Sequence, residues 1–234
     1  MLWFRTILAL CVTLFAGSIA FSADDLLRSA FMKMDQAAGA FKGMTADVTQ
    51  VSHTAAINDD EADIGAIVVR RTKQRSMELL MHFQKPDEKM VHFSGHQLEV
   101  YIPKSNSEQI YDLGKKNNMV QQFFLIGFGS SSQDVRSGYA VKLGGEDTVG
   151  RQKTVRLELT PKSQDVAKLF RLIEIWVAES GDGAGVAVQQ KLHEEGGDYI
   201  LATYSGIKLD PNLQENAVKL SVPRDAAKSY PQVR

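Results

Sequence analysis

Few side chains in this sequence have the types and spacing that chemistry requires. His92 and His96 are four residues apart, which on a helix would place both on one face, where they could bind a metal ion. They flank Ser-Gly at 94–95, which predicts a hairpin turn, so we interpret them as polar strand residues. The acidic run at 59–63 lacks the alternating ligands and central glycine of a calcium loop, and we expect a solvated loop there.

Nucleophiles and phosphate-binding loops are equally scarce. The single cysteine, Cys11, excludes an intramolecular disulfide and any multi-cysteine metal site. No Gly-x-Ser-x-Gly motif is present, and the glycine-rich segment 181–185 leads into a valine-rich strand, whereas a phosphate-binding loop leads into a helix. We therefore expect a protein that acts by binding, without catalysis, cofactor or metal ion.

The composition is that of a folded protein with no electrostatic preference for nucleic acid. Hydrophobic residues make up 44% of the 234 positions and charged residues 24%, which allows a substantial core. The 27 basic residues nearly balance the 28 acidic ones, for a net charge of -1, whereas nucleic-acid binding needs clustered lysine and arginine. We expect no nucleic acid among the partners.

Residues 1–22 have the features of a secretory signal peptide. Arg5 precedes an apolar run at 6–17, and Ala20 and Ser22 place small residues at the -3 and -1 positions of a cleavage after Ser22. The apolar run is shorter than the roughly 20 residues that span a bilayer. We expect export and cleavage after Ser22, with an uncleaved anchor as the alternative.

A first helix is predicted at 24–41. Its apolar residues recur at steps of three and four, and the acidic pair at 24–25 suits the positive end of a helix. A second helix is predicted at 117–128, with an aromatic face that includes Phe123, Phe124 and Phe128, ended by Gly129 and the serines 130–132.

The rest of the chain is predicted to form strands, most clearly at 77–83, where apolar residues alternate with others. Further strands are expected from 44 onward and at 65–71, 89–94, 97–102, 108–113, 140–143, 154–160, 171–178, 186–193, 199–204 and 218–222. The short turns between them favour hairpins, because a parallel crossover needs a dozen or more residues. The prediction is a single α+β domain at 23–234 built on a curved antiparallel sheet.

Large, flexible apolar side chains are abundant on the predicted strands and on the second helix. Methionine and phenylalanine of this kind line adaptable lipid sites, but they also fill ordinary cores. A curved antiparallel sheet with few helices has a concave face that must be covered. If the helices cover it incompletely, a ligand must cover the rest.

Several motifs in order resemble the periplasmic outer-membrane lipoprotein carrier family, LolA. They are Pro-Asp-Glu-Lys-Met-Val at 86–91, Ser-Gly-His-Gln-Leu-Glu-Val-Tyr-Ile-Pro at 94–103, Gln109, Ala-Asp-Val-Thr-Gln at 46–50, the strand with a basic end at 65–71, Phe-Leu-Ile at 124–126 and Leu-Glu-Leu-Thr-Pro-Lys at 157–162. The signal peptide and first helix agree with the same family, so the resemblance extends over nearly the whole mature chain.

This resemblance implies an unclosed (half) β-barrel whose hydrophobic cavity is capped by helices and binds the acyl chains of a lipoprotein. It implies a periplasmic chaperone, expected as a monomer, that carries lipoproteins from the inner to the outer membrane. Its implied partners are an ATP-driven lipoprotein-releasing transporter of the inner membrane and an acceptor lipoprotein of the outer membrane. In the family an arginine on an early strand holds the lid closed by hydrogen bonds to lid backbone. Arg71 is the best match and Arg70 the alternative.

The candidate lipid-binding residues share one predicted strand face or the underside of the second helix. They are Met77, Leu79, Met81, Phe83, Val91, Phe93, Leu98, Val100, Leu157, Leu159, Ile173, Ile175 and Val177 on strands, with Phe123, Phe124 and Phe128 on the helix. A one-residue error in register would move the strand set to the other face.

Three alternatives stay open. The same fold could bind another lipid, such as a phospholipid or a polyprenyl-linked glycan, in envelope biogenesis. The protein could be an exported hydrolase, which requires a nucleophile and base in a cleft. It could also be a structural protein with a filled core.

Overall fold

The chain is described by a computed structural model over residues 23–73, 76–114, 125–209 and 212–231. Its first element is the helix α1 (Ala23–Ala40), which confirms the predicted first helix to within one residue at each end. Asp24 and Asp25 lie in its first turn, where acidic side chains stabilise the helix dipole. Its buried stripe consists of Ala30, Phe31, Met34 and Ala38, spaced to lie on one face. The stripe fixes which side of α1 faces the rest of the molecule.

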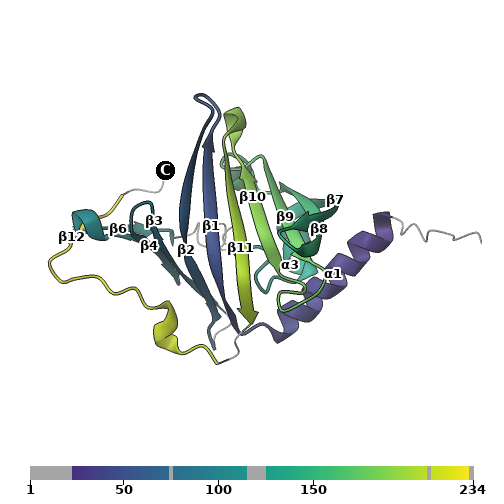
Figure 1. The fold of residues 1–234 in the computed structure, drawn as a ribbon, viewed down its shortest axis with the longest axis horizontal. Helices are drawn as coiled ribbons and strands as arrows, with labels where there is room; N and C mark the ends of the chain where they lie inside the picture. The colour runs from purple at the N-terminus through teal and green to yellow at the C-terminus, as the bar shows by residue number, and fades with distance from the viewer. Residues whose placement is uncertain (1–22, 74–75, 115–124, 210–211, 232–234) are drawn as a thin grey trace, which may run out of the picture.

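One twelve-stranded sheet forms the body of the described chain (Figure 1). The strands are β1 (Gly43–Thr54), β2 (Asp59–Arg71), β3 (Met77–Lys85), β4 (Lys89–Ser94), β5 (Gln97–Ile102), β6 (Ser107–Asp112), β7 (Tyr139–Val149), β8 (Gln152–Pro161), β9 (Leu172–Ala178), β10 (Ala187–His193), β11 (Tyr199–Leu209) and β12 (Ala227–Ser229). Their spatial order is β12-β6-β5-β4-β3-β2-β1-β11-β10-β9-β8-β7.

The sheet is an unclosed half-barrel, as predicted. Every neighbouring pair is antiparallel except β12 and β6, which are parallel. The edge strands β12 and β7 do not pair with each other, so the sheet stays open. Besides α1, the described helices are α3 (Ser132–Gly138) and the single turn α4 (Gln164–Ala167); the 3₁₀ turns are η1 (Pro103–Ser105), η3 (Glu195–Gly197) and η4 (Glu215–Val218). The α+β class is therefore confirmed.

The strand register places the apolar residues on one face. Leu79 of β3 lies opposite Phe93 of β4, which lies opposite Leu98 of β5. Toward the other edge of the sheet, Leu157 of β8 lies opposite Ile175 of β9. Directly opposed residues share a face. With Ala30, Phe31 and Met34 of α1, these residues form one hydrophobic cluster, against which Leu98 packs partly buried. This face is called the inner face below.

The second helix was predicted wrongly where the structure describes it. Residues 117–124 lie outside the described part of the chain, and 125–128 form a turn instead of a helix. Gly127 and Gly129 have φ of +86° and +66°, a backbone conformation incompatible with a continuing helix. The serines expected to end that helix begin the next one, because Ser131 is the N-cap of α3 and forms a capping box with Asp134.

Two further predictions are corrected. The strand expected at 218–222 is absent from the described chain: Val218 ends η4, an irregular segment follows, and the C-terminal strand is β12, which joins the edge of β6. The acidic run at 59–63 is not a loop but the start of β2, where Asp60 lies opposite His53 of β1 and is hydrogen-bonded to its ring nitrogen Nδ1 at 2.8 Å. Cross-strand pairing of this kind stabilises a strand that apolar alternation alone does not reveal.

Candidate functional site

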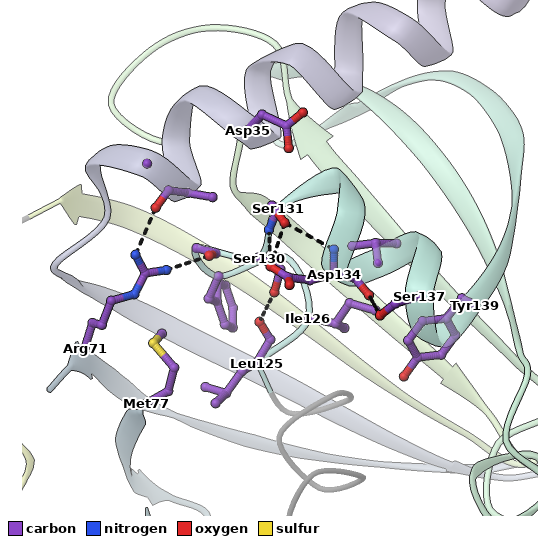
Figure 2. Close-up of a pocket in the computed structure, with 15 residues that line it drawn as sticks. Asp35, Arg71, Met77, Leu125, Ile126, Ser130, Ser131, Asp134, Ser137 and Tyr139 are labelled. Carbon is purple, nitrogen blue, oxygen red and sulfur yellow. Dashed lines mark hydrogen bonds between the residues drawn. The ribbon is translucent and has the colours of Figure 1, made fainter. Parts of the chain in front are cut away.

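A cavity of about 710 Å³ lies where α1, α3 and residues 125–131 meet the ends of β2, β3 and β7 (Figure 2). Residues 125–131 are called the covering segment. The lining consists of Asp35, Ala38, Gly39, Arg71, Met77, Leu125, Ile126, Phe128, Gly129, Ser130, Ser131, Asp134, Val135, Ser137 and Tyr139. Its volume lies within the range of about 300–1,000 Å³ typical of small-molecule sites.

The covering segment is hydrogen-bonded to the sheet. Gln190 of β10, a buried amide on the inner face, donates from Nε2 to the carbonyl of Ile126. The hydroxyl of Tyr204 donates to Oε1 of Gln190 at 3.2 Å, so both ends of the amide are used. The backbone N–H of Ala187 donates to the carbonyl of Gly127 at 3.0 Å. These contacts fix the segment over β10.

The same segment leads directly into a junction between α3 and α1. The backbone N–H and hydroxyl of Ser132 donate to the two carboxylate oxygens of Asp35 at 2.7 and 2.8 Å. Arg136 of α3 lies over the ring of Phe31 of α1, with its guanidinium carbon 4.3 Å from the ring centroid. α3 and α1 are therefore joined by hydrogen bonds and by a cation–π contact, and α1 also contacts β7 and β8.

Arg71, at the end of β2, joins α1 to the covering segment (Figure 2). Its Nη1 donates to the carbonyl of Ala38 at 2.9 Å, and its Nη2 donates to the carbonyl of Gly129 at 2.7 Å. Its guanidinium carbon lies 5.5 Å from the ring centroid of Phe41. A methyl group on Gly129 would come within 2.6 Å of Phe41 and 3.0 Å of Arg71, so this close approach requires glycine.

Arg70 has different partners from those of its neighbour. It donates from Nη2 to Glu78 at 2.6 Å and lies 3.6 Å from the carboxylate of Glu215. With Arg71 it borders a smaller pocket of about 280 Å³, whose other lining residues are Phe41, Lys42, Thr72, Lys73 and Leu213. Of the two arginines that the sequence left open, Arg71 is the one whose hydrogen bonds reach backbone carbonyls of α1 and the covering segment.

The predicted lipid-binding residues that the structure describes fall into three groups. Met77 and Phe128 line the cavity. Most others are packed in the hydrophobic cluster, namely Leu79, Met81, Phe83, Phe93, Leu157, Leu159, Ile173, Ile175 and Val177. Val91, Leu98 and Val100 are partly exposed on the inner face. Phe123 and Phe124 lie outside the described residues. Contact of any of them with a ligand stays a prediction.

Gln190, Asp35 and Tyr139 are among the site residues that were missed at the sequence level. Gln190 carried a detectable signal, since it is the polar member of an otherwise apolar alternation with Val188 and Leu192. Asp35 carried no such signal, because its hydrogen-bond partner, Ser132, lies about 100 residues later in the chain. Tyr139 carried none either, because its position in the cavity is set by the turn into β7.

Two buried tyrosines differ in how their hydroxyl groups are satisfied. Burial raises the pKa of Tyr139 to about 12 and also raises the pKa of Tyr204. Tyr204 donates to Gln190, whereas the hydroxyl of Tyr139 has no hydrogen-bond partner in the part of the chain that the structure describes. Both groups are neutral at physiological pH.

Titratable residues elsewhere pair across strands. The ring of His92 is hydrogen-bonded to Glu99 at 2.6 Å, on neighbouring strands β4 and β5. Within the described ranges, no group of three or more histidine, cysteine, aspartate or glutamate side chains is arranged to hold a metal ion. None of the helices in those ranges combines the length and apolar character needed to cross a membrane.

No family model matches the sequence, and no curated protein matches it. Solved structures do match. A conserved protein from Thermus thermophilus, described as uncharacterised, is 14% identical over 89% of this chain and 99% of its own, with a TM-score of 0.50. The structure of MucB, a protein also matched in its complex with MucA from Pseudomonas aeruginosa, is 12% identical over 85% of this chain, with a TM-score of 0.50. This chain spans 62% of that MucB chain.

A third similar structure is described as a LolA superfamily protein, NE2245 from Nitrosomonas europaea. It is 12% identical over 86% of this chain and 99% of its own, with a TM-score of 0.43. At these identities, the likeness is one of fold.

Proposed function

We propose that this protein is a periplasmic carrier that binds the acyl chains of lipoproteins and moves them from the inner to the outer membrane. The observation that carries the proposal is the cavity of about 710 Å³ beneath the covering segment, with Met77, Leu125 and Phe128 among its apolar lining. Each buried methylene contributes about 0.8 kcal/mol, so even a partly enclosed chain is held in water. The reaction is binding and release, without catalysis.

In this proposal Arg71 is the latch of the cavity. Its two hydrogen bonds join α1 to the covering segment across the cavity, beside Met77. A hydrogen bond to a charged group contributes about 1.5–3 kcal/mol, an amount that an entering ligand can offset. Release then requires an acceptor with a better apolar site. Arg70, the neighbouring arginine, does not have this role and serves as the matched control.

The proposal includes the remaining expectations from the sequence. Residues 1–22 are removed as a signal peptide, and 23–234 act as one monomeric carrier domain. The loading partner is an ATP-driven lipoprotein-releasing transporter of the inner membrane, and the receiver is an acceptor lipoprotein of the outer membrane.

The test is native mass spectrometry of mature protein purified from the periplasm, followed by extraction of the bound molecule. A triacylated lipopeptide on a chain that begins at residue 23 supports the proposal. Recovery of empty protein that takes up no added acyl ligand contradicts it and favours a filled core.

The second candidate is a carrier of the same fold for a different lipid, such as a phospholipid or a polyprenyl-linked glycan. The smaller pocket on the other side of Arg71 favours it, because Lys42, Arg70 and Lys73 gather cationic side chains beside the acyl cavity. Extraction of a phospholipid, with lipoproteins still correctly localised when the protein is absent, would distinguish this candidate from the first.

A further inference from the structure

One polar group in the cavity differs from all the others. Tyr139, the first residue of β7, lines the cavity and is 2% exposed, and its hydroxyl has no hydrogen-bond partner in the described chain. In Figure 2 the hydroxyl points away from Ser131, Asp134 and Ser137, and no dashed line reaches it. Buried polar groups are nearly always hydrogen-bonded, so a buried hydroxyl without such a bond at a cavity wall indicates that a bound molecule supplies the partner.

The other polar side chains around the cavity are already engaged. Ser130 donates to the carbonyl of Leu125 at 3.1 Å, and Ser137 donates to the carbonyl of Asp134 at 2.7 Å. The hydroxyl of Ser131 donates to the carboxylate of Asp134 at 2.7 Å.

The remaining charged groups of the lining are engaged as well. Asp35 accepts two hydrogen bonds from Ser132, and Arg71 donates to two backbone carbonyls. An entering ligand can therefore bond to Tyr139 without breaking a contact within the protein. At every other polar side chain of the described lining, it must compete with one.

The surroundings of Tyr139 select the chemistry of that ligand. Val135 and Ile126 of the same lining are buried and apolar, and Arg71, the cationic side chain of the lining, already donates to two backbone carbonyls, so a charged ligand group would lose its hydration there without gaining an equivalent partner. A phenol is a good donor to a neutral carbonyl oxygen. An acyl chain attached through an ester or an amide carries one such carbonyl at the head of its hydrocarbon.

We infer that the hydroxyl of Tyr139 donates a hydrogen bond to the acyl carbonyl of the cargo, so that the cavity recognises acyl esters and amides in preference to plain hydrocarbon or ether chains. This inference rests on the acyl-binding function proposed above and names the chemical group that the cavity recognises. Tyr139 is a binding residue that fixes how deeply the chain enters, since its hydroxyl is the one polar side-chain group of the described lining that is not already hydrogen-bonded within the protein.

The experiment compares two ligands that differ only at the carbonyl, 1-palmitoylglycerol and its ether analogue 1-hexadecylglycerol, with the wild-type protein and with Tyr139→Phe. Wild-type protein should bind the ester about 10-fold more tightly than the ether, as one neutral hydrogen bond allows. In Tyr139→Phe the ester should lose that advantage, and the affinity for the ether should not change.

Tyr204→Phe is the matched control. Tyr204 is also a buried tyrosine, but its hydroxyl is bonded to Gln190, and it does not line the cavity. Tyr204→Phe should be less stable to denaturant than wild type and keep the preference for the ester. Tyr139→Phe should be at least as stable as wild type, because the substitution removes a hydroxyl that is unpaired in the empty protein.

A spectroscopic measurement gives an independent reading. With the ester carbonyl labelled with ¹³C, its infrared band should move to lower frequency on binding to wild-type protein and should lie higher in Tyr139→Phe. An equal loss of ester and ether affinity in the variant, or an identical band in both proteins, would overturn the inference and leave Tyr139 as a partner of buried water. If wild-type protein bound neither ligand, the proposed acyl-binding function would fail first.

Discussion

The two halves of the inner face are covered differently. In the β7–β9 half, Leu157, Leu159, Ile173 and Ile175 are completely buried, and α1 contacts β7 and β8. In the β3–β5 half, Leu79 and Phe93 are also completely buried, but Val91, Leu98 and Val100 of the same face remain partly exposed. Figure 1 shows α1 and α3 together beside β7–β9, away from β3 and β4. The two halves are called the covered half and the open half below.

This difference separates two uses of the same residue types. Leucine, isoleucine and phenylalanine on the covered half have protein side chains as neighbours, so their contribution is to stability. Val91, Leu98 and Val100 on the open half keep surface that a ligand can bury, and Arg71 and the cavity lie between the two halves. An apolar inner face is therefore not one continuous binding site.

The strongest test of this comparison is a pair of leucine truncations. Leu157→Ala, in the covered half, should lower the free energy of unfolding by about 3–4 kcal/mol, because it leaves a cavity among fully buried side chains. Leu98→Ala, in the open half, should cost about 1 kcal/mol, since its side chain is already partly exposed. Denaturant titration measures both. Equal losses would show that the halves are equivalent.

The next effect concerns the covering segment. Gly129→Ala should destabilise the protein by about 3 kcal/mol, because a side chain is strained at positive φ and would also overlap Phe41. Gly95→Ala is the control: Gly95 has a similar φ of +59°, but a methyl group there meets open space, so only about 1–2 kcal/mol is lost. If the two variants lost the same amount, the close packing over Phe41 would not matter.

Tyr139, where the covered half borders the cavity, should make the free energy of unfolding depend on pH in alkaline solution. The pKa of Tyr139 in the folded protein, about 12, lies above its ordinary value of 10.0, so the folded state holds the proton more tightly than the unfolded state. The associated stability is fully present below pH 10 and is lost as the pH rises through 12. The part of the free energy of unfolding that depends on this hydroxyl is about 2–3 kcal/mol. Denaturant titrations from pH 9 to 12 should therefore fall less steeply for Tyr139→Phe than for wild type. Parallel curves would rule the effect out.

The smallest expected effect is on the local opening of the covering segment, which Arg71 holds between the covered and the open half. Arg71→Ala should lower the free energy of opening of residues 125–131 by about 2 kcal/mol, because two charge-assisted hydrogen bonds are lost. Hydrogen exchange of the backbone amides reports it directly. Arg70→Ala removes the same charge but only the pairing with Glu78 and Glu215, and should leave exchange in the covering segment unchanged. Faster exchange in both variants would argue that the charge, not the contact, matters.

Local patterns predicted the elements whose contacts are close in sequence. The spacing of Phe31, Met34 and Ala38 gave α1, and the alternation in 77–83 gave β3 with the correct face inward. The hairpin turns then gave the antiparallel order from β2 to β6. In each of these cases the sequence of the element and its packing favour the same structure.

The failures come from long-range contacts and from backbone constraints. The aromatic spacing around Phe128 is typical of a helix, but glycines at positive φ and the contact with Gln190 set a turn there. β12 pairs with β6, more than 100 residues earlier, and no local pattern in 218–231 indicates that neighbour. Arg71 was named through the resemblance, and its role as a latch stays a prediction. Tyr139 required the three-dimensional arrangement, because a sequence does not show that a hydroxyl has no hydrogen-bond partner.

The contacts of Arg71 also bear on how this protein can evolve. Both carbonyls that it bonds belong to the backbone, at Ala38 and Gly129, so neither hydrogen bond is made to a side chain. Substitutions at Leu125, Ile126 or Phe128 can reshape the cavity while that attachment is kept. If the function proposed above is correct, substitutions at a few apolar positions would change which molecule the cavity accepts during evolution, while Arg71 and its two hydrogen bonds are kept.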